Sequence, residues 1–225
     1  KFFKTGTVTN PVNMPSIPKE KLAEVEPFFA LAEKLGKFLI QVTEESIKQL
    51  NISYAGEVAN FDVRPLTANA IKGLLSTNHG SHVNDVNARY LAERIGIQIN
   101  EHKTTTAKGF TNLITVEIVT ETETHTVAGT LLNGLGARIV KVEGFVVDVI
   151  PNGNLLYIKN QDKPGSIGRV ATKLAEKDIN IATMQVGRDQ IGGSAVMMLV
   201  VDNEVTTEDL IFVAQLENID EVKAI

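Results

Sequence analysis

One short segment holds the residues of this chain whose types and spacing best suit the binding of a small molecule. It reads Asn160-Gln161-Asp162-Lys163-Pro164-Gly165-Ser166-Ile167-Gly168. We expect a strand to end near Lys159 and a helix to follow, with Asp162 as its N-cap. Pro164 would then lie in the first helical turn, where a missing N–H costs least. Gly165 has no side chain, so a ligand or another backbone can come close to it.

The charges in this segment match those of a zwitterion. The free N–H groups of a helix N-terminus favour an anion such as a carboxylate, and Asp162 supplies the charge that an ammonium group requires. Asn180 begins the next expected strand, and its amide can donate and accept hydrogen bonds at once. These features favour an α-amino acid as ligand. The same residues fit equally well a helix N-cap followed by proline that binds nothing, because such caps are common.

The elements around this segment follow a regular order. We expect strands at 155–159, 179–188, 194–201 and 216–225, and helices at 165–177 and 207–214, the first with Ile167, Val170 and Leu174 facing inward. The order βαββαβ is that of the ferredoxin-like fold. Pro151-Asn152-Gly153-Asn154 is a turn, so we predict a domain over residues 152–225.

The preceding residues predict a second domain of mixed type over 21–151. Its long first helix has apolar residues at helical spacing: Leu22, Val25, Phe29, Ala32, Leu35, Leu39 and Val42. Helices at 64–75 and 83–95 and strands at 49–58, 97–101, 112–120, 123–132, 137–143 and 145–150 are expected after it. The chain as a whole is therefore predicted to be α+β. Residues 1–20 contain three prolines that disfavour regular structure, and they predict a stub and linker.

Composition excludes several classes of protein. The 225 residues are 43% hydrophobic and 22% charged, which fits one or two ordinary globular domains. The net charge of −5 gives no electrostatic footprint for nucleic acid. No apolar run is long enough to span a bilayer. The absence of cysteine excludes disulfides and thiolate chemistry and suits a reducing cytoplasm, where we expect the protein to work.

No motif for catalysis is visible. Gly134-Leu135-Gly136-Ala137-Arg138-Ile139 resembles a dinucleotide fingerprint, but it lacks the third glycine and leads into an expected strand. The sequence contains no P-loop and no Gly-x-Ser-x-Gly motif. His79 and His82 would need two more ligands to hold a metal ion. We therefore predict no catalytic residues, no cofactor and no metal site in this chain.

Two stretches of the chain resemble known families. Asp162 to Gly168, followed by Ile179-Asn180-Ile181, resembles the ACT domain signature. Gly109 to Ile114, Ala128 to Leu131 and Arg138 to Phe145 resemble the intervening domain of long-form 3-phosphoglycerate dehydrogenase, and Val12-Asn13-Met14-Pro15 is similar to the end of that family's nucleotide-binding domain. The resemblance implies a regulatory region of an enzyme of serine biosynthesis, with L-serine or another small amino acid as effector. NAD and the catalytic residues would belong to the catalytic domains, which have no counterpart here.

The resemblance also implies particular residues. In the family, serine bridges two ACT domains of a homo-oligomer, and the contacting positions match Asn160, Asp162 and Asn180, with Pro164 and Gly165 in the turn between them. Many relatives have His or Tyr where this chain has Asn160. In some relatives a basic cluster in the intervening domain binds an anion. Arg138 matches that cluster and Lys141 is a possible substitute, whereas positions 145, 146 and 150 are apolar here.

Two alternatives stay open at this point. The β chain of an iron–sulfur L-serine dehydratase also joins such a domain to an ACT domain, but it predicts a Ser-Ser-His type motif before Gly36, which is absent. A free-standing ACT sensor predicts no long domain before the ACT unit, and residues 36–150 count against it.

Overall fold

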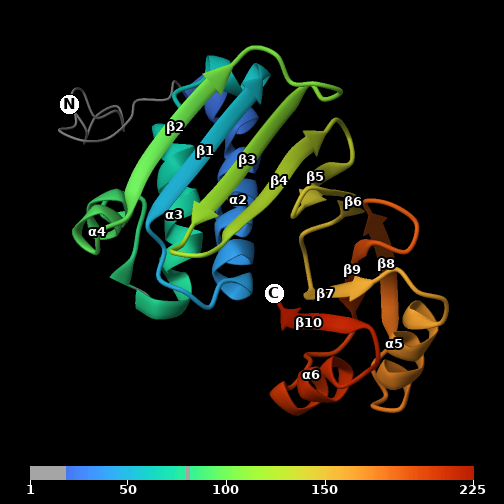
Figure 1. The fold of residues 1–225 in the computed structure, drawn as a ribbon. Coiled ribbons are helices and arrows are strands. Elements are labelled where there is room, and N and C mark those ends of the chain that lie inside the picture. Colours follow the sequence, from blue (N-terminus) through green and yellow to red (C-terminus); the bar gives the residue numbers. More distant parts are fainter. Residues whose placement is uncertain (1–18, 80–81) are drawn as a thin grey trace.

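The protein contains two β-sheets, each covered by helices on one face (Figure 1). The structure is a computed structural model that describes residues 19–79 and 82–225, so the predicted stub of residues 1–20 lies almost entirely outside it. Six strands form the first sheet and four antiparallel strands form the second. This confirms the α+β prediction. None of the described helices is long and apolar enough to cross a membrane.

The first sheet has the order β2-β1-β3-β4-β5-β6. Only β1 and β2 pair in parallel; every other neighbouring pair is antiparallel. In β3, Ile114, Val116 and Ile118 are buried while the residues between them are partly exposed, as the alternation predicts for a sheet with one covered face. The strands are β1 (Gln49–Gly56), β2 (Gln98–Thr104), β3 (Asn112–Val119), β4 (Thr124–Leu132), β5 (Gly136–Val142) and β6 (Phe145–Val149).

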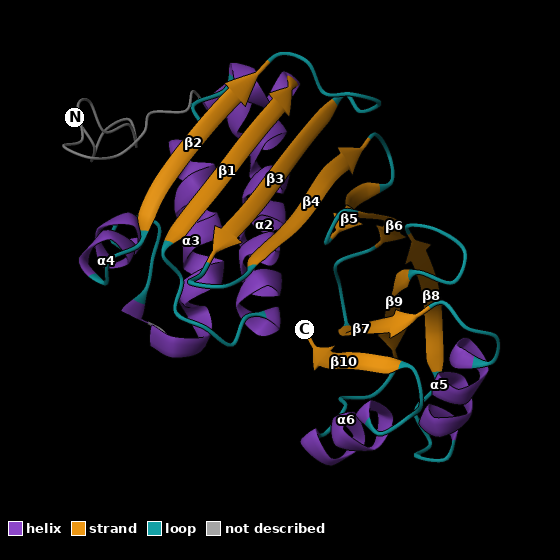
Figure 2. Ribbon diagram, viewed as in Figure 1, coloured by secondary structure: helices purple, strands orange, loops and turns teal. Residues whose placement is uncertain are grey.

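Two long helices, α2 (Lys19–Val42) and α3 (Arg64–His79), cover one face of this sheet (Figure 2). The helices touch backbone to backbone, because a Cβ added at Gly36 or at Gly73 would overlap a carbonyl oxygen of the other helix. A short 3₁₀ helix, η1 (Glu57–Asn60), follows β1.

The helix expected over 83–95 is shorter than predicted. It is α4 (Ala88–Arg94), because the side chain of Asn84 accepts hydrogen bonds from the amides of Val86 and Asn87. Such an Asx turn competes with helical hydrogen bonding and delays the start of the helix.

The second sheet has the order β10-β7-β9-β8. Its elements are β7 (Asn154–Gln161), α5 (Ser166–Ala175), β8 (Ile181–Arg188), β9 (Ser194–Val201), α6 (Thr207–Ala214) and β10 (Ile219–Ala224), which confirms the predicted βαββαβ order. In α5, Val170 and Leu174 are fully buried as expected, but Ile167 is 46% exposed. The prediction for Ile167 was wrong because this residue, in the first turn of the helix, does not pack against the core of the second domain.

The two sheets share a hydrophobic core through β7. Leu156 and Ile158 pack under α5 and α6, whereas Leu155 and Tyr157, on the opposite face of the strand, pack into the core of the first domain. The connection between β6 and β7 contains the predicted division at residues 151 and 152. Because the core crosses that connection, the two domains are joined by packing as well as by the chain.

Candidate functional site

The turn before α5 differs from the prediction in its capping. Gly165 is the N-cap, in a left-handed conformation with φ of 87°, and no side chain caps the helix. Pro164 therefore precedes the cap and does not lie in the first helical turn. A left-handed cap favours glycine, since a side chain there would be strained.

Asp162 is held by the loop between β8 and β9. Its Oδ2 accepts hydrogen bonds from the backbone N–H of Gly192 at 3.2 Å and from the Arg188 guanidinium at 3.0 Å. Its own N–H donates to the carbonyl of Gly193. The N-cap role predicted for Asp162 was wrong, because the loop draws its carboxylate away from the helix. The Gly192 amide and the Arg188 guanidinium lower the pKa of the Asp162 carboxyl below its ordinary value, so this carboxylate is charged at neutral pH.

Asn160 is the buried polar residue of the turn, with only 2% of its surface exposed. Its Nδ2 donates to the carbonyl of Gln161 at 2.8 Å, but its Oδ1 is buried and has no hydrogen-bond partner in the part of the chain that the structure describes. An unpaired buried acceptor costs about 1–3 kcal/mol. Asn160 therefore carries an unmet requirement for a donor.

Asn180 lies at the opposite end of the same sheet. Its Nδ2 donates to Asp202 Oδ2 at 2.7 Å. Asn160 pairs with Ala195 at the start of β9, whereas Asn180 bonds to Asp202, just beyond the end of β9. The two asparagines are therefore separated by the length of that strand, roughly 20 Å or more at 3.3 Å per residue. One copy of the chain thus brings Asn160 and Asp162 together but not Asn180.

The N-terminus of α5 presents free donors. The backbone N–H groups of Ile167 and Gly168 have no acceptor among the described residues. A Cβ added at Gly168 would meet nothing within 4 Å, so there is open space beside these donors.

Two arginines near the turn were not singled out from the sequence. Arg188 ends β8 and binds Asp162. Arg169 lies in the first turns of α5, and its guanidinium reaches Ser166 Oγ at 3.5 Å. A basic residue so close to a helix N-terminus opposes the helix dipole. This unfavourable placement is the feature of the sequence that could have identified Arg169 as a candidate site residue.

The residues proposed for an anion site in the first domain are differently placed. The Arg138 Nε is 3.2 Å from Asp148 Oδ1, and its Nη1 donates to the carbonyls of Leu135 and Ala137. Lys141 is exposed on the same strand, β5, and a register shift in the pairing of β5 with β6 separates it from Ile139. Arg138 already has an anionic partner, and the anion site stays a prediction.

No group of three or more potential metal ligands occurs among the described residues. The side chain of His79 lies outside that part of the structure. The glycine-rich segment at Gly134 forms the turn between β4 and β5, where Gly134 and Gly136 have positive φ, and it leads into a strand as expected.

A βαββαβ sheet whose first turn holds free N–H donors and an unpaired buried acceptor is typical of small-molecule-binding domains. Comparison with protein families places residues 154–211 in the ACT domain family and residues 24–143 in the D-3-phosphoglycerate dehydrogenase intervening domain family. The chain therefore belongs to the D-3-phosphoglycerate dehydrogenase family and contains its regulatory ACT and intervening regions.

Individual relatives agree with this assignment. The chain is 37% identical over 224 residues to the D-3-phosphoglycerate dehydrogenase of Bacillus subtilis, covering 100% of this chain and 42% of that protein. It is also 37% identical over 225 residues to that of Methanocaldococcus jannaschii, covering 100% of this chain and 43% of the relative. The sequence thus spans less than half the length of the curated relatives that it matches.

Proposed function

We propose that this chain senses L-serine on behalf of a D-3-phosphoglycerate dehydrogenase. The observation that carries the proposal is the buried, unpartnered Oδ1 of Asn160, whose side chain shares the Gln161 carbonyl with Ser166 at the start of α5, where N–H groups are free. A serine ammonium can donate to Asn160, and a serine carboxylate can accept from the helix N-terminus. The charged Asp162 adds a negative field that favours an ammonium.

The proposed site is completed by a second copy of the chain. Strand β8 is an edge of its sheet, and an edge strand leaves unpaired backbone groups that can pair with another chain. If two β8 strands pair antiparallel about a two-fold axis, the start of one lies beside the end of the other. That arrangement brings the partner's Asn180 toward Arg188, which contacts Asp162. Serine bound there would tie two subunits together, and such coupling can change the state of catalytic domains.

The whole-chain similarity to D-3-phosphoglycerate dehydrogenases supports this reading over the two alternatives, a dehydratase β chain and a free-standing ACT sensor. Catalysis and NAD binding would belong to other domains. We therefore expect the isolated chain to show no turnover with 3-phosphoglycerate and NAD.

Titration calorimetry of the 225-residue chain with L-serine, glycine and L-alanine tests the site. L-Serine should give heat at millimolar concentration or below. Asn180→Ala should weaken binding because each lost hydrogen bond contributes about 0.5–1.5 kcal/mol. Lys163→Ala, an exposed neighbour in the same turn, is the control and should bind as the parent does. The absence of serine heat, or unchanged binding by Asn180→Ala, would overturn the assignment.

A mixing experiment tests the shared site. Asp162→Ala and Asn180→Ala should each bind serine poorly alone. Unfolding and refolding them together should recover part of the binding, because a mixed dimer contains one site with both residues intact. If both residues acted within one copy, mixing would recover nothing. Sedimentation should show an oligomer at micromolar concentration, whereas a clean monomer would contradict pairing through β8.

A further inference from the structure

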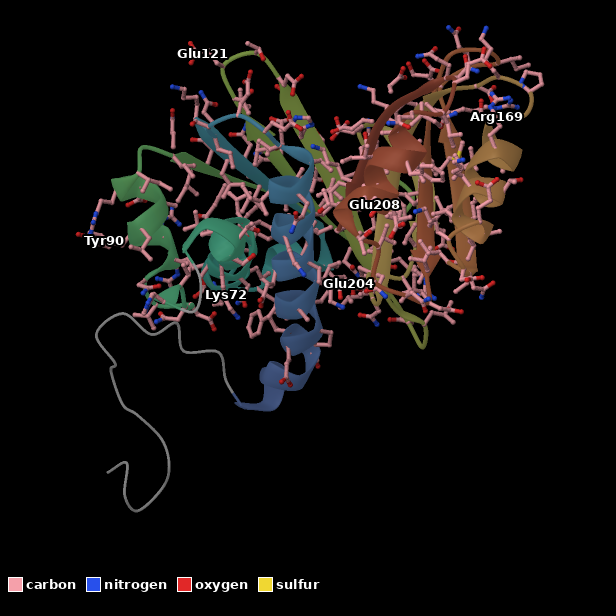
Figure 3. All side chains as sticks on the ribbon, turned by 90° about the horizontal axis from the view of Figure 1, so that it is seen from below. Lys72, Tyr90, Glu121, Arg169, Glu204 and Glu208 are labelled. Carbon is pink, nitrogen blue, oxygen red and sulfur yellow. The ribbon has the colours of Figure 1, made fainter. Side chains whose placement is uncertain are left out.

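We infer that Arg169 is a specificity-determining residue that recognises the carboxylate of the amino-acid effector, closing over the N-terminus of α5. This inference rests on the proposed function and adds a residue to its site. Figure 3 shows Arg169 at the end of the second domain where α5 begins, among the loops of that end.

The guanidinium of Arg169 lies against the turn that would receive the carboxylate. A Cβ added at Gly165, the helix N-cap, would be only 2.8 Å from Arg169 Nη1. Arg169 Nη2 is 3.5 Å from the hydroxyl oxygen of Ser166, the first residue of the helix. A cation beside the positive end of a helix is electrostatically unfavourable. An anion placed between the helix end and the guanidinium would be attracted by both, and would replace this repulsion with two favourable interactions.

Arg169 also lacks the partners that other arginines of the protein have. Arg64, Arg89, Arg138 and Arg188 each form an ion pair with an aspartate or glutamate, whereas Arg169 and the exposed Arg94 have no carboxylate partner among the described residues. Its Nε is buried and has no hydrogen-bond acceptor in the described part of the chain. A buried donor without an acceptor is rare in native structures. Arg169 therefore has a free donor that a ligand acceptor could pair with.

The second unpartnered group of this end of the domain is an acceptor, Asn160 Oδ1. A common carbonyl connects the two side chains: Asn160 Nδ2 and Ser166 Oγ both donate to Gln161 O, at 2.8 Å and 3.4 Å, and Ser166 Oγ is the atom that Arg169 Nη2 approaches. The cluster thus combines unsatisfied donors, on Arg169 and on the helix amides, with one unsatisfied acceptor. An α-amino acid carries the complementary set, a carboxylate and an ammonium on the same carbon.

Arginine suits this role because its planar guanidinium can bind both oxygens of one carboxylate. Arg188, the other arginine near the turn, is already held by Asp162 at 3.0 Å. Since Asn160 is almost completely buried, an ammonium can reach it only after a neighbouring side chain moves. Arg169 is anchored by one long contact to Ser166, and in the proposal its guanidinium moves outward to admit the ligand and then closes on the carboxylate.

Titration calorimetry with three ligands separates this role from a general loss of binding. The ligands are L-serine, L-serinamide, which carries an uncharged amide in place of the carboxylate, and ethanolamine, which has no carboxylate. We expect Arg169→Gln to weaken L-serine binding about 10- to 100-fold, the loss expected for a charge-assisted hydrogen bond. Its affinity for L-serinamide and ethanolamine should equal that of the parent chain. Arg169→Lys, which keeps the charge but loses the planar fork, should be intermediate for L-serine.

Lys173→Gln, further along the same helix and paired with Glu176, is the matched control and should leave all three affinities unchanged. Circular dichroism confirms that each variant is folded, and Arg169→Lys stands in if Arg169→Gln is not. If the parent chain binds L-serine and Arg169→Gln binds it equally well, or loses all three ligands in parallel, the role of Arg169 is wrong while the proposed function stands. If the parent chain binds no amino acid, both are wrong.

Discussion

Phe38 of α2 and Tyr157 of β7 meet edge to face, with ring centroids 5.9 Å apart and ring planes at 82°. One ring belongs to the first domain and the other to the ACT domain. Both are fully or almost fully buried, at 0% and 2% exposure. Aromatic pairs of this geometry add about 0.5–1.5 kcal/mol beyond the area that they bury. The contact makes the relative position of the two domains depend on packed side chains.

Replacing Phe38 tests whether the two domains unfold together. Phe38→Ala should lower the free energy of unfolding by about 3–5 kcal/mol, because it removes a buried ring and leaves a cavity. Calorimetry should show one transition for the parent chain, at a higher temperature than for the variant. Leu135→Ala, at a residue that is 64% exposed, is the control and should change stability by less than about 0.5 kcal/mol. Two well-separated transitions in the parent would contradict the shared core.

The backbone contact between α2 and α3 predicts a second effect on stability. Gly73→Ala should destabilise the chain by about 1–3 kcal/mol, since the new methyl group overlaps the carbonyl of Glu33. Gly168→Ala is the contrasting helical substitution, because open space surrounds that position. It should be neutral or stabilising by about 0.5–1 kcal/mol. Urea titration of both variants measures the difference, and equal stabilities would show that the helices can move apart at no cost.

His125 predicts a dependence of stability on pH. Its hydrogen bond to Glu143, helped by Glu123, raises the pKa of the imidazole above its ordinary value, against the opposing effect of burial. The charged pair therefore stabilises the fold fully below the unfolded pKa of about 6.5, and this stabilisation is lost as the pH rises through the folded pKa. We expect His125→Gln to melt below the parent at pH 6 and level with it at pH 9. A gap in melting temperature that is constant between pH 6 and pH 9 would argue against the pair.

The loop between β8 and β9 should depend on the ion pair of Asp162 and Arg188. Arg188→Gln removes one of the two donors to the Asp162 carboxylate and leaves the Gly192 amide as the other. Hydrogen exchange at residues 189–193 should become faster, because the loop loses a charged anchor. Exchange at the start of α6, which follows the opposite end of β9, should not change. Unaltered exchange in the loop would show that its backbone hydrogen bonds suffice to hold it.

The sequence by itself determined the order of the α-helices and strands, although it did not reveal the short 3₁₀ helix η1. Helical spacing from Val25 to Val42 is sufficient to identify α2, and strict alternation identifies β3, because both depend on local periodicity and on which face is buried. The βαββαβ order of residues 154–224 and the position of the turn at Pro164 and Gly165 follow from local signals in the same way. Asp162 could be proposed because it directly precedes that turn in the chain, whereas Asn160 was proposed only from the resemblance to the ACT domain signature.

Only the tertiary structure decided which side chains meet. Asp162 turns from the helix to Arg188 because β9 lies between β7 and β8 in the sheet and brings the loop after β8 to the end of β7. Asn180 lies a full strand length from Asn160. In the sequence, Asn160 is near the end of β7 and Asn180 comes just before β8, with only α5 between them. The unpaired atoms of Asn160 and Arg169, and the contact between Phe38 and Tyr157, depend on burial by residues distant in the chain. Local periodicity carries no information about such contacts, because it specifies which face of an element is buried but not what covers it.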